Sequence, residues 1–380
     1  MLAPSGTLDP GYVVVEDGKI REIGRGAPSV PAGALHIDAA GLRVAPGFID
    51  THTHGINGHD AMTGTEGIEG MSAEHASHGV TAFLPTLVSA PRRELLDLVA
   101  RTSGVRGSGA RVLGLHLEGP FLDPAMPGMF DPAAFRPFDA REFGDLAVAA
   151  GGALKLITLA CQGARSAALP AILEAGVIPS LGHAAGGFDD GIRAFDAGAR
   201  RCTHCFNAMT GFHHREPGLV GAVLDRADVL AELIFDGLHV APPVGRLLLA
   251  LKGPEGVILV TDSIVCAGFP DGDYEWAGYS IRIAGGAARI PAGNLAGSVL
   301  TLDQAVRNAV SLLGASVEAA VEMASLTPAR AIEVHSTKGN LAPGKDADIV
   351  LLDSSLSPVA TMVEGEVVWK ADPAAYQTPR

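Results

Sequence analysis

The strongest constraint on the fold is a regular alternation of short apolar segments with helical segments between residues 47 and 340. The apolar segments read as buried parallel strands, because Val, Leu and Ile run through them without polar alternation. Helical stretches such as 91–103, 164–176 and 189–198 separate them. Strand–helix units repeated in this way predict an α/β fold of the (β/α)8, TIM-like barrel type. The predicted strands are Gly47–His52, Thr81–Pro85, Val112–Leu117, Leu154–Leu159, Ile178–Leu181, Arg201–Thr203, Leu230–Phe235 and Val257–Thr261.

The two ends of the chain differ from this middle part. Residues 12–24 form two β runs joined by Asp17-Gly18, and residues 359–370 form two more with Glu364-Gly365 at the turn. Dipeptides of this kind favour hairpins. We therefore expect residues 1–46 and 341–380 to build one small β domain, with residues 47–340 as the barrel and a β insertion near 268–297.

Polar residues gather where the predicted barrel strands end. In barrels of this type the chemistry occurs at the carboxyl ends of the strands, so these side chains are expected to meet. A single histidine after a strand is more often an ordinary loop residue, but histidines and carboxylates after several neighbouring strands indicate a common site. The residues concerned are His52, His54, Glu118, His183, His204, Asn207, His239 and Asp262.

The types of these residues indicate metal chemistry. His52 and His54 lie two apart, so on a strand both imidazoles point to the same side. Neutral imidazole and carboxylate ligands suit zinc and similar divalent ions, and a catalytic ion activates water and polarises a carbonyl. Asp262, after the last strand, is placed to take a proton from that water and return it to a leaving amine.

Composition and charge exclude several other classes. The formal net charge is −14 without a basic run, which argues against nucleic acid as a partner. No segment is apolar enough for a bilayer, no signal peptide is visible, and 4 cysteines are too few for a disulfide framework, so a cytoplasmic protein is expected. An anionic substrate would need a local cation such as Arg215, because its guanidinium can hold phosphate as a fork.

With these motifs in their order, the sequence resembles the amidohydrolase superfamily, and within it the N-acetylglucosamine-6-phosphate deacetylase family. The segments that carry the resemblance are PGFIDTHTHG, GLHLEGPF, LGHA, THCFNAM, REPGLVGAVL, DGLHV, LVTD, LAGS and APGKDADIVLLD.

The resemblance implies a distorted barrel with a small β-sandwich, a homodimer, and hydrolysis of N-acetylglucosamine 6-phosphate to glucosamine 6-phosphate and acetate. It assigns a principal metal to Glu118, His183 and His204, with His52 and His54 holding a second ion in some members. Zinc is expected first, and iron, cobalt or manganese are alternatives. Asp262 would be the catalytic base and acid. Substrate contacts are expected from Asn207, Ala208, Arg215 (reaching across the dimer to the phosphate), His239, Leu295, Ala296 and Gly297.

One position departs from the family pattern. Phe130 stands where the family usually has a histidine that contacts the substrate near the scissile amide. Phenylalanine can neither donate a hydrogen bond nor carry charge. The sequence therefore leaves open an alternative substrate, such as another N-acyl amino sugar or a related amide. A dihydroorotase-like site is disfavoured because Lys155 lies at the wrong end of its strand, and a binding-only homologue is disfavoured because all expected ligands are present.

Overall fold

The computed structural model describes residues 1–3, 6–26, 28–29, 33–162, 168–276 and 278–372. Its largest element is a parallel sheet in which each strand pairs with the next along the chain. The last and first strands meet where the main-chain N–H of Asp262 donates to the carbonyl of His52 at 2.8 Å. The sheet therefore forms the predicted barrel. Its strands are β6 (Phe48–Thr53), β9 (Val80–Val88), β11 (Leu115–Glu118), β12 (Leu154–Leu159), β13 (Ile178–Leu181), β14 (Arg201–Cys202), β15 (Leu230–Ile234) and β16 (Val257–Val260).

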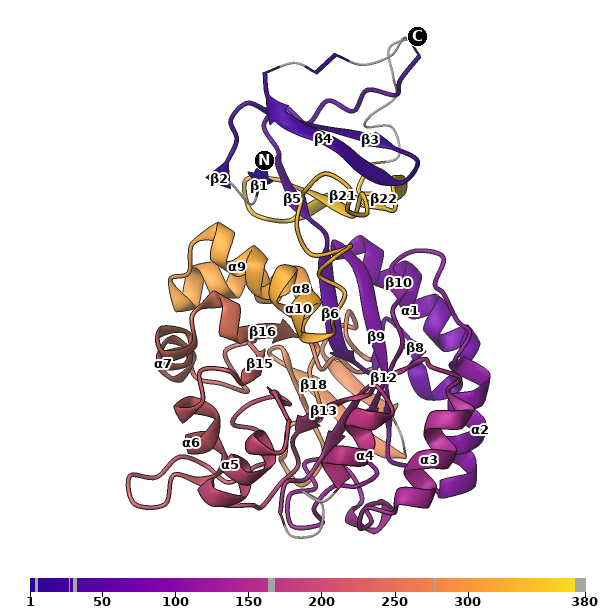
Figure 1. Cartoon of the computed structure of the whole chain (residues 1–380), viewed down its shortest axis with the longest axis vertical. Coiled ribbons are helices and arrows are strands. Elements are labelled where there is room, and N and C mark those ends of the chain that lie inside the picture. The colour runs from indigo at the N-terminus through magenta and orange to yellow at the C-terminus, as the bar shows by residue number, and fades with distance from the viewer. Residues whose placement is uncertain (4–5, 27, 30–32, 163–167, 277, 373–380) are drawn as a thin grey trace.

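Helices follow these strands and surround the barrel (Figure 1). Helix α2 buries Leu95, Leu98 and Val99 at helical spacing, and Asp139 caps α3 by accepting from the backbone of Arg141 and Glu142. The predicted helix at 164–176 appears as α4, although residues 163–167 lie outside the described chain. The helices are α1 (Thr65–Ser77), α2 (Arg92–Thr102), α3 (Ala140–Ala149), α4 (Leu169–Glu174), α5 (Phe188–Asp196), α6 (Gly218–Asp225), α7 (Pro242–Lys252), α8 (Leu302–Asn308), α9 (Val317–Ala324) and α10 (Leu326–Ala331).

Shorter elements complete the barrel region. They are the 3-10 turns η1 (Ala61–Thr63), η2 (Pro132–Ala134) and η4 (Pro254–Gly256), the π-helical turn η5 (Ala309–Leu313), and the strands β7 (Gly55–Ile56), β8 (His59–Asp60) and β10 (Arg111–Val112). Among the described residues, none of the helices combines the length and apolar character that a membrane crossing requires.

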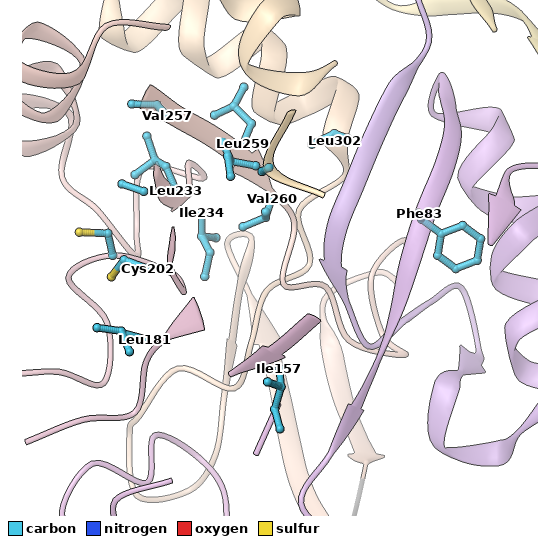
Figure 2. Packing of buried hydrophobic residues seen from close by; sticks show 14 of the residues in the cluster. Phe83, Ile157, Leu181, Cys202, Leu233, Ile234, Val257, Leu259, Val260 and Leu302 are labelled. Atoms are coloured by element: carbon cyan, nitrogen blue, oxygen red, sulfur yellow. The ribbon is translucent and has the colours of Figure 1, made fainter. Parts of the chain in front are cut away.

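The main core lies around the barrel strands and is built largely from aliphatic side chains. Figure 2 shows Leu233 and Ile234 of β15 close to Val257, Leu259 and Val260 of β16. Every residue of β9 and β16 is buried, as expected for strands covered on both faces. This packing fixes the strand ends, and therefore the side chains that follow them, in a rigid frame.

Both chain ends form antiparallel sheets that lie together above the barrel in Figure 1. The hairpin turns Asp17-Gly18 and Glu364-Gly365 have positive φ at both residues, as type I′ turns require. Ile20, Ile349 and Ala360 contribute to a separate small core. Residues 4–5, 27, 30–32 and 373–380, which the sequence assigns to the same region, lie outside the described chain. The strands are β1 (Leu2–Ala3), β2 (Gly6–Thr7), β3 (Gly11–Glu16), β4 (Lys19–Arg25), β5 (Arg43–Pro46), β20 (Ile349–Leu352), β21 (Pro358–Val363) and β22 (Glu366–Lys370).

The predicted insertion is a three-stranded antiparallel sheet that follows the last barrel strand. It packs with Met129 and Ile264 into a second small core, and Trp276 donates from Nε1 to Oδ2 of Asp60 at 2.8 Å. The insertion therefore lies against the carboxyl ends of the barrel strands; residue 277 lies outside the described chain. Its strands are β17 (Gly272–Trp276), β18 (Tyr279–Ala284) and β19 (Ala287–Arg289).

Candidate metal centre and active site

Four histidines and two carboxylates meet at the carboxyl end of the barrel. They come from the ends of five strands that the core holds in place. Three of them, His183, His204 and Asp262, have φ of 45°, 29° and 48°, a backbone conformation that costs energy in a non-glycine residue. Such strain persists where the surrounding structure holds it, and it is frequent at functional sites. The six residues are His52, His54, Glu118, His183, His204 and Asp262.

Glu118 lies at the centre of this cluster. Its Oε1 is 3.1 Å from Nε2 of His183 and 3.1 Å from Nε2 of His204, and its Oε2 is 3.3 Å from Nε2 of His54. The ligand atoms fall into two groups, each within 4.8 Å, and both groups contain Glu118. One group is His52, His54 and Glu118; the other is Glu118, His183 and His204. These are the residues expected from the sequence to hold one or two ions.

The hydrogen bonds of the imidazoles fit a cation between them. Nδ1 of His183 lies 2.8 Å from the carbonyl of Met126, and Nδ1 of His54 lies 3.2 Å from the carbonyl of Thr86. A carbonyl only accepts, so each Nδ1 carries a proton, and in the neutral imidazole, the form that binds a metal ion, Nε2 presents its lone pair to the cluster. Nε2 of His183 and His204 are 3.2 Å apart. Lone pairs facing each other and a carboxylate are repulsive, and a divalent ion removes that repulsion.

The electrostatics of the cluster point the same way. Burial alone would lower the pKa of His54, but the carboxylates of Asp262 and Glu118 raise it to about 9. Burial alone would raise the pKa of Glu118, but His52 and the other imidazoles hold it well below its usual range. The site therefore favours positive charge next to two buried carboxylates. Nε2 of His52 and Oε2 of Glu118 are buried without a hydrogen-bond partner, as free metal ligands would be.

A second set of buried groups orients His52, and the sequence reasoning missed it. Glu232 on β15 accepts from Nδ1 of His52 at 2.9 Å and from the backbone N–H of His204 at 3.0 Å. Arg201 on β14 donates to the same carboxylate at 2.6 Å. Carboxylates that hold the far nitrogen of a histidine ligand fix its tautomer and orientation. The available signal was a glutamate inside the apolar run VLAELIF, where an unpaired charge would be costly.

A cavity of about 370 Å³ opens over the cluster. Its wall combines the proposed ligands other than His52, the loop 128–130 and the insertion, which contributes Trp276 and the turn after β19. Expected residues that line it are His54, Glu118, His183, His204, Asn207, Ala208, His239, Asp262, Leu295 and Gly297. Nδ1 of His239 pairs with Oδ2 of Asp236 at 2.6 Å, which leaves Nε2 as the ring nitrogen available to a ligand.

Two of the expected substrate-binding residues lie elsewhere. Ala296 is fully buried and packs in the core of the insertion with Ile264 and Trp276, because the backbone there pairs with β19. Arg215 lies on an exposed loop, where its Nη1 is 2.7 Å from Nε2 of the neighbouring His214. The structure therefore brings neither side chain to the cavity of its own protomer.

Phe130 lies beside the metal centre. Its ring centroid is 6.3 Å from that of His54 and 6.0 Å from that of His183, and it contributes to the cavity wall. Its loop is held close to the cluster by Gly128 (φ 63°), where a Cβ atom would lie 3.1 Å from Cε1 of His183. The departure from the family pattern thus places an apolar ring against both ligand groups.

A parallel barrel with histidine and carboxylate ligands at its carboxyl end defines a class of metal-dependent hydrolases. The model of the amidohydrolase family matches residues 43–368, and the chain belongs to this family.

Similar proteins narrow the comparison. The chain is 38% identical over 374 residues to an N-acetylgalactosamine-6-phosphate deacetylase of Escherichia coli O157:H7, covering 97% of both chains. It is 37% identical over 354 residues to the human N-acetylglucosamine-6-phosphate deacetylase, covering 89% of this chain and 86% of the relative. The crystal structure of N-acetyl-D-glucosamine-6-phosphate deacetylase from Mycobacterium smegmatis superposes with a TM-score of 0.88, 34% identity and coverage of 94% and 95%.

Proposed function

We propose that this protein is a metal-dependent deacetylase that converts N-acetylglucosamine 6-phosphate into glucosamine 6-phosphate and acetate. The observation that carries the proposal is Glu118 between two histidine groups, with Asp262 beside them at the floor of a cavity. The two relatives named above match 97% and 89% of this chain, and their names describe them as deacetylases of N-acetylhexosamine 6-phosphates. They do not favour the alternative of a different N-acyl amino sugar or a related amide, which the sequence raised because of Phe130.

The metal ligands proposed are Glu118, His183 and His204 for the principal ion and His52 and His54 for a second one. Zinc is the proposed ion, because a set rich in neutral imidazoles with one carboxylate suits its preferences; iron, cobalt and manganese are the alternatives. When bound, the ion lowers the pKa of a water molecule and polarises the acetamide carbonyl.

Asp262 is the proposed catalytic base and acid. Its Oδ1 lies 3.1 Å from Nε2 of His54 and 3.4 Å from Nε2 of His52, so it adjoins the two proposed ligands of the second ion. Burial would raise the pKa of Asp262, but the charges of His52 and His54 lower it, which keeps the carboxylate ready to accept a proton. Asp262 would take the proton of the attacking water and return it to the amine nitrogen as the C–N bond breaks.

Substrate contacts are proposed for the residues that line the cavity beyond the metal centre. Asn207, Ala208 and His239 would contact the sugar phosphate, and Leu295 and Gly297 would contact the sugar ring. Arg215 is proposed to act across a homodimer, which suits a loop that also carries Phe212, a phenylalanine that is 60% exposed.

Acetate release from N-acetylglucosamine 6-phosphate tests the proposal. Protein stripped by a chelator should be inactive and should recover turnover on reloading with zinc. An Asp262→Asn variant should keep its metal and lose about 10²–10⁴-fold in kcat, the usual contribution of a general acid–base group. The galactosamine epimer is assayed in parallel because one relative is named for it. Metal-loaded protein that releases acetate from neither epimer would contradict the proposal.

A further inference from the structure

One wall of the cavity is apolar and lies directly against the proposed metal ligands. The ring centroid of Trp276 is 6.0 Å from that of His54, and the ring centroid of Phe130 is 6.3 Å from His54 and 6.0 Å from His183. Met129 is buried beside them in the small core that the insertion builds. All three residues contribute to the cavity wall, and we call Met129, Phe130 and Trp276 the apolar wall.

The apolar wall offers little to a polar group. The indole Nε1 of Trp276, the only donor of that ring, is used by Oδ2 of Asp60 at 2.8 Å. The main-chain N–H of Phe130 donates to the carbonyl of Pro127 at 3.1 Å. The ring of Phe130 has no donor, and the thioether of Met129 is only a weak acceptor. A polar group placed against this wall would therefore lose its hydrogen bonds to water without gaining new ones.

The loop that carries Phe130 is held at a fixed place beside the metal ligands. Nδ1 of His183 lies 2.8 Å from the carbonyl of Met126, and a Cβ atom on Gly128 would lie 3.1 Å from Cε1 of the same histidine. From the other side, Nδ2 of Asn294 donates to the carbonyl of Gly128 at 3.3 Å. The apolar wall is therefore a preformed surface, tied both to a metal ligand and to the insertion.

The position of the apolar wall determines which part of the proposed substrate it contacts. The carbonyl carbon of the amide has to lie beside the metal ligands and Asp262, the proposed base for the attacking water. The alkyl part of the acyl group is bonded directly to this carbon, so it stays next to the ligands, where the apolar wall lies. The sugar is attached through the nitrogen and extends further, toward the residues proposed for it, such as Asn207 and His239.

We propose that the apolar wall binds the acyl group of the substrate and selects acyl groups with a plain alkyl chain, such as acetyl, over those that carry a hydroxyl group. This inference rests on the proposed function and adds selectivity for the acyl group to it. A hydroxyl group against the apolar wall gives up its hydrogen bonds to water without replacement, which disfavours binding. Apolar pockets reject an added hydroxyl only moderately, by about 10–100-fold, so the preference is expected in that range.

Two sugars that differ by one oxygen atom test the inference. N-acetylglucosamine 6-phosphate and its N-glycolyl analogue, in which the acetyl methyl carries a hydroxyl, are assayed by release of glucosamine 6-phosphate. The zinc-loaded parent should favour the acetyl sugar in kcat/KM by about 10–100-fold. Phe130→His should reduce this ratio about tenfold, the effect of one hydrogen bond, because an imidazole can pair with the hydroxyl. Phe130→Leu should keep the ratio, because leucine is also apolar.

The matched control is Phe269→His. Phe269 packs in the same small core, with its ring centroid 5.1 Å from that of Tyr274, but it lies outside the described cavity wall. This variant should keep the ratio of the parent. Because both sugars are compared in one protein, the ratio does not depend on the fraction that is folded or loaded with metal.

Calorimetry adds a measurement that does not depend on turnover. The Asp262→Asn variant should bind the acetyl sugar with a Kd about 10–100-fold lower than that of the glycolyl sugar. Equal Kd or kcat/KM values for the two sugars, a ratio that Phe130→His leaves unchanged, or an equal change in Phe269→His would overturn the inference while the proposed function stands. A parent that hydrolyses neither sugar would overturn the proposed function, and the inference with it.

Discussion

Two buried clusters of carboxylates in this protein differ in whether a lysine or arginine pairs with them. At the junction of barrel and terminal sheets, Nζ of Lys338 lies 2.7 Å from Asp348 and 2.8 Å from Asp346. At the carboxyl end of the barrel, Glu118 and Asp262 are surrounded by imidazoles, and no lysine or arginine of the described chain pairs with either. A buried carboxylate cluster that carries its own cation is destabilised when that cation is removed, whereas one that lacks it is suited to bind a metal.

The largest expected effect comes from removing the carboxylate shared by both ligand groups. Glu118→Gln should abolish metal retention and lower acetate release by about a thousandfold or more, since a bound ion contributes several kcal/mol to the barrier. The metal-free variant should be less stable than the metal-free parent, because the substitution removes the buried carboxylate that pairs with the imidazoles, which hold its pKa well below its usual range. Elemental analysis measures the metal content, turnover measures acetate release, and urea unfolding measures the stability. A Glu118→Gln variant that binds metal and is active would contradict the proposal that this cluster is a metal site.

Removing the cation of the Lys338 cluster should lower stability without affecting metal binding. Lys338→Met leaves Asp348 buried without its partner and should lower the free energy of unfolding by about 3–5 kcal/mol. Metal content and kcat of the folded fraction should match the parent. Urea unfolding against an Arg93→Ala control, in which an exposed arginine is removed, provides the measurement. Loss of bound metal in the folded Lys338 variant would show that the two clusters are coupled.

Glu232 sharpens the comparison because it belongs to both kinds of cluster. It pairs with Arg201, as in a structural ion pair, and it also holds Nδ1 of His52. Glu232→Gln should weaken the ion at His52 and His54 by about 10–100-fold, the usual effect of losing a group that orients a metal ligand. Competition with a coloured chelator measures the affinity, and exposed Glu255→Gln serves as control. Equal affinity in both variants would assign Glu232 to stability alone.

The smallest effect concerns a carboxylate near the start of α8 that has two partners. Asp303 lies 3.1 Å from Nδ1 of His78 and 2.8 Å from Nη1 of Arg307. Burial would raise the pKa of Asp303, but His78 and Arg307 lower it from 3.8 to about 2. A lowered carboxyl pKa stabilises the fold above the unfolded value, so the contribution is lost as the pH falls from about 4 to about 2. Asp303→Asn should therefore cost about 2 kcal/mol at neutral pH.

Urea unfolding of the parent and Asp303→Asn at several pH values checks this prediction. The difference between the two proteins should be largest near pH 5, where Asp303 is ionised, and should shrink below about pH 4 as the carboxylate is protonated. A difference that does not change with pH would mean that packing, and not charge, accounts for the effect of the substitution.

The sequence by itself determined the barrel and the identity of the groups at its carboxyl end. Local patterns were sufficient for this, because uninterrupted apolar strands predict a parallel sheet and strand ends meet at one face. The structure places His52, His54, Glu118, His183, His204 and Asp262 together, as that reasoning expected. The hairpins at Asp17-Gly18 and Glu364-Gly365 could also be predicted from local sequence, because each turn type depends on two residues.

Only the tertiary structure decided which charges face each other across the chain. Glu232 and His52 are 180 positions apart and lie on strands separated by β16, so no local pattern could pair them. The same holds for Arg215, which does not reach the cavity of its own protomer. A strand can be recognised from residues that are adjacent in the sequence. The closure of a barrel and the path of a loop depend instead on contacts between residues far apart in the sequence.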